Sequence, residues 1–232
     1  MNNLCKSLVV ATFGVVALGS IEAKSIELVD LPSRQGYSIG YQLGSDFVAK
    51  DIAISPEALL AGIKDAMSGG DSALSREQMS QILSDLQKQV EEKRRAMMQK
   101  VAEDNRLAEN KFFTENGAKE GVISLPSGLQ YKILTEGTGQ KPSAISSVTV
   151  NYRGTLPDGT EFDSSYKRGK PASFPVNRVI AGWTEALQLM PVGSKWILYV
   201  PATLGYGERG AAPLIGPSQT LVFEVELISI EK

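Results

Sequence analysis

The sequence predicts an α+β protein with an all-α N-terminal region, a long connecting helix, and a C-terminal antiparallel β-sheet wrapped on a short helix. Residues from about 25 to 116 are rich in Ala, Gln, Glu, Lys, Leu and Met at helical spacing. Residues from about 122 to 232 are rich in Val, Ile, Thr, Gly and aromatics, and they alternate as strands do. No proline or glycine lies between Gly70 and Gly117, so one helix can cross most of that interval.

Residues 1–23 are typical of a secretory signal peptide. Lys6 precedes an apolar run over residues 8–18, and small residues follow, so we expect cleavage after Gly19 or Ala23. The run is shorter than the about 20 residues that a spanning helix needs, which favours a cleaved signal over an uncleaved anchor. We therefore expect an exported chain with no transmembrane span after signal removal.

Composition excludes several kinds of chemistry. The chain has no histidine, which removes Ser-His-Asp catalysis, histidine-ligated zinc and the usual proton shuttle at neutral pH. Its one cysteine, Cys5, cannot form an intramolecular disulfide. The net charge of −2 gives no basic surface for nucleic acid. We expect no cofactor, no bound metal and no nucleic-acid partner.

The region 24–74 is predicted to hold two helices. The first covers about residues 33–50 and carries Gly36, Gly40 and Gly44 on one stripe. Because glycine inside a helix costs ~1 kcal/mol against alanine, the stripe indicates close approach by another helix. A locally weak helix or a loop is the alternative. The second helix begins at Ser55-Pro56, a good N-cap followed by a good first residue, and ends at Gly69-Gly70.

The region 75–116 is predicted to form the connecting helix. Residues 75–78 have the pattern of a capping box, which indicates the start of a helix. In the middle of the predicted helix, residues 91–95 place charged side chains on nearly every face. A solvated middle suits a rod between two bodies better than a compact intramolecular bundle. Because the two preceding helices are too few to bury their own apolar stripes, we expect a homodimer through the N-terminal helices.

The region 117–232 is predicted to be mainly β-sheet. Strand alternation covers residues 129–134, 147–153, 160–162, 195–200 and 220–230, with a turn at Pro157-Asp158-Gly159. Residues 178–189 are the one helical candidate. An antiparallel sheet with this short helix on one face follows from the order of these segments.

Five motifs in this region identify a family. They occur in order over about 110 residues: Val150–Gly154, Gly159–Ser165, Val179–Trp183, Pro201–Gly207 and Leu221–Leu227. The region thereby resembles the FKBP family of peptidyl-prolyl cis/trans isomerases, which bind tacrolimus and rapamycin. The whole chain resembles the bacterial macrophage infectivity potentiator (Mip) type, with a signal peptide (1–23), a helical dimerisation domain (24–74), a connecting helix (75–116) and an isomerase domain (117–232).

The resemblance implies a set of site residues. Those in the catalytic pocket are Tyr152, Phe162, Asp163, Ile180, Trp183, Tyr206 and Phe223, and those that help to bind the substrate or ligand are Phe174, Val179, Arg168, Leu214 and Ile215. Trp183 would be the floor, and the Ile180 N–H and the Tyr206 hydroxyl would donate to ligand carbonyls. Arg168 would pair with Asp163. The loop 208–218 matches the family least, which leaves substrate preference open.

The resemblance also implies what the chain does. It predicts an exported isomerase of proline-containing proteins in the periplasm, or at the outer membrane or cell surface, of a Gram-negative bacterium, with a role in virulence as a further expectation. Rotation about an X–Pro bond needs no acid, metal or cofactor, so the absence of histidine fits. The alternatives are a chaperone or surface adhesin that uses the same pocket with little catalysis, and a purely structural envelope protein. Taken singly, each aromatic residue could simply be core.

Overall fold

The computed structural model describes residues 27–231 of the 232-residue chain. The predicted signal peptide and Cys5 lie outside the described residues. The chain divides into two compact units between Ser75 and Arg76, which we call the N-terminal and C-terminal units. Within residues 27–231, no helix is both long and apolar enough to cross a membrane. The finer division at residues 24, 75 and 117 stays a prediction.

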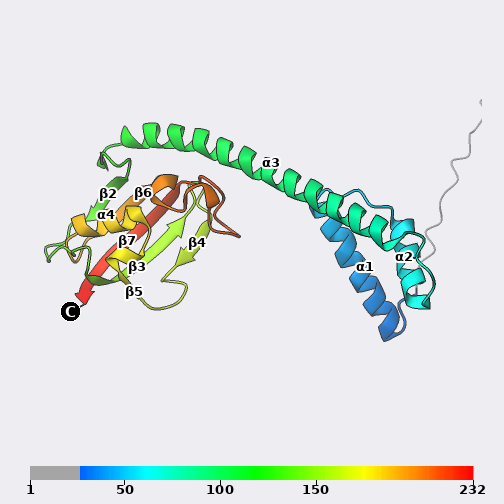
Figure 1. Cartoon of the computed structure of the whole chain (residues 1–232). Coiled ribbons are helices and arrows are strands. Elements are labelled where there is room, and N and C mark those ends of the chain that lie inside the picture. Colours follow the sequence, from blue (N-terminus) through cyan, green and yellow to red (C-terminus); the bar gives the residue numbers. More distant parts are fainter. Residues whose placement is uncertain (1–26, 232) are drawn as a thin grey trace, which may run out of the picture. The chain divides into compact units, whose positions relative to one another are not determined.

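Over residues 27–75, the described part of the N-terminal unit, the chain forms two helices, as the sequence predicts (Figure 1). Helix α1 is Leu31–Ala49, and the side chain of Asp30 caps it by accepting from the Ser33 N–H at 2.7 Å. Helix α2 is Pro56–Ser68, and the hydroxyl of Ser55 accepts from the Ala58 N–H at 3.2 Å. Gly69 ends α2 in the left-handed region, with φ of 69°, where glycine has no steric penalty.

The N-terminal unit buries none of the residues of α1 or α2. Large apolar side chains on these helices are exposed, and they include Tyr37, Ile39, Tyr41, Leu60, Ile63 and Met67. The glycine stripe of α1 is helical, so the alternative of a loop is wrong. A Cβ added at Gly36, Gly40 or Gly44 would meet nothing within 4 Å. Among residues 27–231, therefore, nothing occupies the space that the stripe leaves open.

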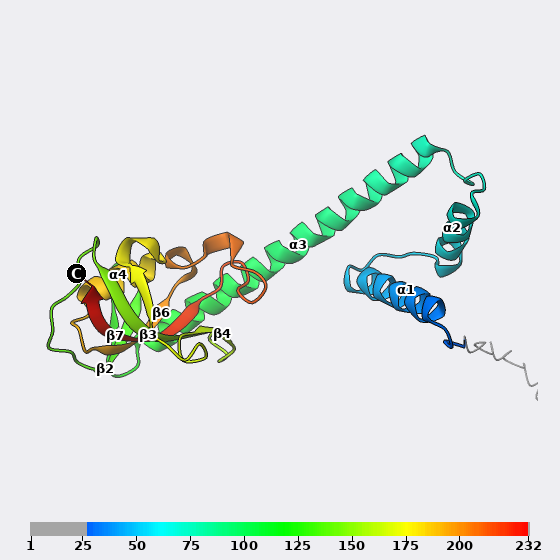
Figure 2. The same cartoon turned by 90° about the horizontal axis from the view of Figure 1, so that it is seen from below.

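Helix α3, Arg76–Gly117, is the predicted long helix and has 42 residues (Figure 2). Its charged middle is exposed, and there Glu91 pairs with Arg94 and Arg95 at 2.9 Å. Its later turns pack on the sheet of the C-terminal unit. Asn116 is buried and donates to Gln130 at 2.9 Å, and the Phe112 ring lies 5.9 Å from that of Tyr199.

The sheet of the C-terminal unit is antiparallel and has seven strands in the order β1-β2-β6-β7-β3-β4, with β5 paired to β3. The strands are β1 Val122–Ser124, β2 Gln130–Thr135, β3 Ser147–Thr155, β4 Glu161–Ser164, β5 Ala172–Pro175, β6 Lys195–Val200 and β7 Leu221–Glu231. All the predicted strands are confirmed. The short strands β1 and β5 were not predicted, because their pairing with β2 and β3, and not a pattern in their own residues, makes them strands.

Helix α4, Ala181–Leu189, lies across one face of the sheet (Figure 1). The prediction of one short helix over residues 178–189 is confirmed from Ala181 onward, whereas Arg178 belongs to the separate 3₁₀ helix η1, Val176–Arg178. Leu187 is fully buried in the core between α4 and the sheet. A Cβ at Gly182 would lie 2.7 Å from Val200, so glycine lets α4 approach β6 closely. Two more 3₁₀ turns, η2 Ala202–Leu204 and η3 Gly207–Arg209, precede β7.

Candidate functional site

An aromatic cavity of about 470 Å³ opens between α4 and the sheet. Ten residues line it: Tyr152, Phe162, Asp163, Phe174, Arg178, Val179, Ile180, Trp183, Tyr206 and Phe223. All of them except Arg178 are among the predicted site residues. Arg178 directly precedes the motif Val179–Trp183, and this position in the sequence was the only indication that Arg178 lines the cavity.

Seven structural elements bring the lining residues together. On β3, residues with even numbers point into the core, so Tyr152 follows Val148 and Val150 onto the same face. Phe162 and Asp163 come from β4, which pairs with β3 in antiparallel orientation. The remaining lining residues come from β5, from η1 and the start of α4, from the turn between η2 and η3, and from β7. Residues about 70 positions apart thus form one cavity.

Trp183 sits among three aromatic rings in edge-to-face geometry. Its ring centroid is 5.2 Å from that of Tyr152, 6.0 Å from Phe174 and 5.3 Å from Phe223, with interplanar angles between 81° and 89°. Such pairs contribute about 0.5–1.5 kcal/mol each beyond their burial, so the cluster holds the indole in place. Trp183 is 4% exposed, and its Nε1 is buried with no hydrogen-bond partner in the part of the chain that the structure describes.

Gly154 lets two walls of the cavity meet. A Cβ there would lie 2.7 Å from the Phe162 ring and 2.8 Å from the Phe223 ring, which is too close for carbon atoms. These two rings pack edge to face at 5.5 Å and 87°. The absence of a side chain at residue 154 therefore allows the Phe162 and Phe223 rings to pack in this arrangement.

Asp163 belongs to a three-residue network at the cavity's edge. The Tyr152 hydroxyl donates to one carboxylate oxygen, and the Arg168 guanidinium donates to the other. Arg168 also donates to the Tyr152 oxygen at 2.6 Å, and it lies 5.3 Å from the centre of that ring. The Ser164 N–H adds a bond of 2.8 Å to Asp163. Four donor contacts fix the orientation of the carboxylate and the phenol.

This network sets the charges of its members. Burial acts to raise the pKa of Asp163, but hydrogen bonds from Tyr152 and Arg168 outweigh it and hold the pKa below the ordinary value of 3.8. Burial, and the hydrogen bond to Asp163, raise the pKa of Tyr152 above 10. At neutral pH Asp163 is therefore an anion and Tyr152 is protonated. Neither group is suited to exchange a proton there, so the network orients and does not act as an acid or base.

Besides the Trp183 Nε1, the Ile180 N–H and the Tyr206 hydroxyl have no protein partner in residues 27–231. Ile180 is the N-cap of α4, and its carbonyl accepts from the N–H groups of Trp183 and Thr184 at 2.9 and 3.0 Å. No protein acceptor takes the Ile180 N–H, and none bonds the Tyr206 hydroxyl, among these described residues. Tyr206 is 42% exposed. Both groups are free to donate to a ligand.

Three predicted site residues lie outside the cavity lining. Arg168 contacts the cavity through Asp163 and Tyr152. Leu214 is half exposed, and Ile215 is buried in the core, where its backbone forms two hydrogen bonds with that of Ala211. No residue of the loop 208–218, in which the last two lie, lines the cavity, and Tyr206, which does, lies two residues before this loop.

The structure also bears on two other kinds of site, a catalytic pair of carboxylates and a metal site. Glu161 and Asp163 are two residues apart, but Glu161 pairs with Arg153 at 2.6 Å and with Lys167 at 2.9 Å, whereas Asp163 pairs with Arg168. The two carboxylates are therefore engaged separately and do not form a catalytic pair. Among the described residues, no group of three or more Asp, Glu, Cys or His side chains could hold a metal ion.

Comparisons with known proteins agree with this geometry. Residues 138–228 match the family model described as FKBP-type peptidyl-prolyl cis-trans isomerase. Outer membrane protein MIP of Legionella longbeachae is 52% identical over 199 residues, which are 86% of this chain and 85% of that protein. The chain belongs to the FKBP-type peptidyl-prolyl cis-trans isomerases. The predicted family, fold and enzyme class are confirmed.

Other relatives extend the similarity of this FKBP-type isomerase to its N-terminal helices. Residues 33–133 match the model of the domain amino terminal to FKBP-type isomerases. The FKBP-type 22 kDa isomerase of Escherichia coli is 45% identical, over 86% of this chain and 96% of that one. The crystal structure of FkpA from Escherichia coli superposes with a TM-score of 0.71 at 35% identity, over 88% of this chain and 98% of that chain.

Proposed function

We propose that this isomerase works outside the cytoplasm as a homodimer, and that it rotates X–Pro bonds of exported proteins with the proline ring held in the aromatic cavity. The observation that carries the proposal is the cavity itself. Three aromatic rings pack around Trp183 in its lining, and two unpaired donors, the Ile180 N–H and the Tyr206 hydroxyl, belong to lining residues.

The walls favour the twisted amide over the planar one. The barrier to rotation is about 18–20 kcal/mol because twisting removes amide resonance. The planar amide carries more charge separation than the twisted form, so moving the bond from water to an apolar cavity costs the planar form more. Each ~1.36 kcal/mol of this difference gives a tenfold increase in rate. Phe162, Phe174 and Phe223 supply apolar surface for this effect.

The polar groups would hold the substrate in the twisted geometry. The Ile180 N–H and the Tyr206 hydroxyl can each donate to a carbonyl beside the proline. Asp163 is anionic and held by Tyr152 and Arg168, so it fixes the Tyr152 ring against the Trp183 floor. This assignment gives Asp163 a positioning role and needs no transferred proton.

Peptide isomerisation and proline-limited refolding test the assignment. The wild type is expected to accelerate both, and Tyr206→Ala combined with Asp163→Ala is expected to reduce kcat/KM by roughly a hundredfold, since it removes a donor and the network. Tacrolimus or rapamycin should compete for the cavity. Full activity of the double variant would contradict the assignment. Client binding that survives the double substitution without any turnover would favour a chaperone or adhesin instead.

The proposed homodimer follows from the exposed apolar faces of the N-terminal unit. Tyr41, Leu60 and Met67 are 69%, 52% and 85% exposed, and no atom of the described residues fills the space beside the α1 glycines. A second copy would cover these faces and use the close approach that glycine permits. Sedimentation of the full mature chain should give a dimer, and a chain beginning at Arg76 should give a monomer. A monomeric full chain would refute the assembly.

Export is proposed on the predicted signal peptide, and a relative supports it. The Legionella longbeachae protein is named an outer membrane protein. Fractionation of a Gram-negative host that expresses the full chain should place it in the periplasm or the outer membrane, with the N-terminus beginning after Gly19 or Ala23. Recovery of the intact chain from the cytoplasm would contradict this localisation.

A further inference from the structure

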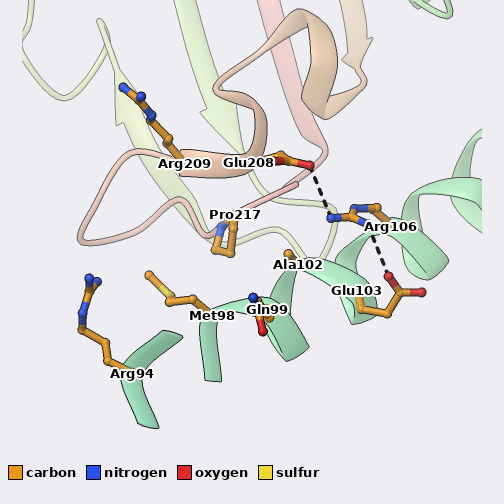
Figure 3. Close-up of a pocket in the computed structure, with 9 residues that line it drawn as sticks. All are labelled: Arg94, Met98, Gln99, Ala102, Glu103, Arg106, Glu208, Arg209 and Pro217. Atoms are coloured by element: carbon orange, nitrogen blue, oxygen red, sulfur yellow. Dashed lines mark hydrogen bonds and ion pairs between the residues drawn. The ribbon is translucent and has the colours of Figure 1, made fainter. Parts of the chain in front are cut away.

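A second hollow lies within the C-terminal unit, between α3 and the loop that begins with η3 (Figure 3). It has a volume of about 560 Å³, against about 470 Å³ for the aromatic cavity. Its lining residues are Arg94, Met98, Gln99, Ala102, Glu103 and Arg106 of α3, and Glu208, Arg209 and Pro217 of the loop. We call it the helix–loop cleft.

The helix–loop cleft combines an apolar floor with a polar rim. Figure 3 shows the Pro217 ring directed toward α3, close to Met98 and Ala102. Met98 is 42% exposed, and a flexible thioether adapts to apolar side chains of different shape. Gln99 and Arg106 place amide and guanidinium groups around this floor. Apolar surface beside several donors and acceptors suits a peptide, which presents side chains and backbone amides together.

Hydrogen bonds fix the two walls of the cleft. The Asn105 side chain donates to the Pro217 carbonyl at 2.8 Å, and Arg106 contacts Glu208 of the loop and Glu103 of its own helix at 3.4 Å each (Figure 3). The hollow is therefore formed before any ligand arrives. A preformed site loses less conformational entropy on binding than one that must first assemble.

One short turn connects the helix–loop cleft with the aromatic cavity. Tyr206 lines the cavity, and Glu208, two residues later, lines the cleft. Their Cα atoms are at most about 7 Å apart, because a chain spans no more than ~3.6 Å per residue. An extended polypeptide advances ~3.3 Å per residue. A substrate whose proline occupies the cavity can therefore cross η3 within about three to five residues.

We propose that the helix–loop cleft is a second binding subsite for polypeptide substrates, and that it takes an apolar side chain a few residues away from the isomerised proline. The assignment rests on the proposed function of the aromatic cavity. The cleft contributes affinity for long substrates and does not touch the rotating bond. It therefore lowers KM for long substrates, and it leaves kcat and the activity on short peptides unchanged.

Two neighbouring methionines of α3 offer a matched test in the full chain. Met98→Lys puts a charge on the floor of the cleft, whereas Met97→Lys makes the same change at a residue that is 70% exposed and does not line the cleft. Lysine suits a helix about as well as methionine. The substrates are a tetrapeptide with one X–Pro bond, a peptide of about ten residues with leucines beside the same core, and its serine counterpart.

We expect Met98→Lys to raise KM for the long leucine peptide roughly fivefold, with kcat unchanged. The tetrapeptide should be unaffected, and Met97→Lys should match the wild type on every substrate. In the wild type, the leucine peptide should show a lower KM than the serine peptide, which tests the subsite without any substitution. Equal KM values for the leucine and serine peptides, or equal effects of the two lysine variants, would overturn the subsite.

The failure of the subsite differs from the failure of the cavity assignment. If the wild type isomerises the tetrapeptide but its KM is the same for the leucine and the serine peptide, the cleft assignment alone is wrong. If the tetrapeptide is isomerised as fast after Tyr206→Ala combined with Asp163→Ala, the cavity assignment is wrong, and the cleft assignment falls with it.

Discussion

Glu109 of α3 should be required for the stability of the C-terminal unit, although it lies far from the sheet in sequence. One of its carboxylate oxygens accepts from the Ala202 N–H at 2.7 Å and from the Thr220 hydroxyl at 2.9 Å. Ala202 and Thr220 are 5% and 3% exposed. They stand at the two ends of the segment that carries Tyr206, so one carboxylate holds both ends of that segment.

Replacing Glu109 by alanine leaves two buried donors without an acceptor. An unsatisfied buried polar group costs about 1–3 kcal/mol, and water that enters beside α3 recovers part of the loss. We therefore expect Glu109→Ala to lower the free energy of unfolding by about 2–4 kcal/mol. Glu109→Gln keeps an acceptor oxygen at the same place and should cost about 1 kcal/mol, the share owed to the negative charge.

Urea unfolding followed by tryptophan emission measures this loss directly. Both tryptophans of the chain, Trp183 and Trp196, lie in the C-terminal unit, so the signal reports on that unit. With an m value of about 2–3 kcal/mol/M, the midpoint for Glu109→Ala should fall by about 1 M. Glu115→Ala is the matched control, because Glu115 is exposed on the same helix and its ion pair with Lys111 is 3.9 Å long.

Two results would refute this reasoning. If Glu109→Ala unfolds at the wild-type midpoint, the carboxylate does not hold α3 to the segment 202–220. If Glu109→Gln is as unstable as Glu109→Ala, the hydrogen-bond acceptor is not what matters at this position.

Three further predictions concern the cavity and its network. Gly154→Ala should push the Phe162 and Phe223 rings apart and lower the free energy of unfolding by about 1–3 kcal/mol through overpacking, which urea unfolding would measure. It should also reduce kcat/KM in a peptide assay. An unchanged kcat/KM would mean that the ring positions do not matter. Because the pKa of Asp163 is lowered, its contribution to stability is present above about pH 4 and disappears as pH falls through the folded-state pKa. Arg168→Ala should move this loss of stability to higher pH when unfolding is measured as a function of pH. A loss at the same pH as in the wild type would contradict the pairing. Because burial raises the pKa of Tyr152, kcat/KM should stay flat from about pH 6 to 9, and a basic limb within that range would show that the phenol ionises there.

Local patterns in the sequence predicted most of the fold. Alternation of apolar residues located β3, β6 and β7, because a strand with one buried face repeats every two residues. Ser55-Pro56 and Gly69 located both ends of α2, since caps depend on neighbouring residues only. The strands β1 and β5 were missed because their pairing, and not their own sequence, makes them strands.

The candidate site could be predicted in part. The family resemblance named nine residues that line the cavity, and it also named Arg168, Leu214 and Ile215, which do not line it. Leu214 and Ile215 lie in the loop that matches the family least, and their role in binding stays a prediction. Arg178 was missed because a lone arginine before an apolar motif looks like any surface residue.

The sequence by itself determined the helical and β regions, the length of α3 and the identity of the aromatic pocket, because these depend on periodicity, capping and ordered motifs. Only the tertiary structure decided how Asp163, Tyr152 and Arg168 share their hydrogen bonds. It also decided that Glu109 holds the later turns of α3 to both ends of the segment 202–220, and that a second cleft opens beside η3. These features join residues up to about 110 positions apart, and contacts at that separation leave no periodic trace in one sequence.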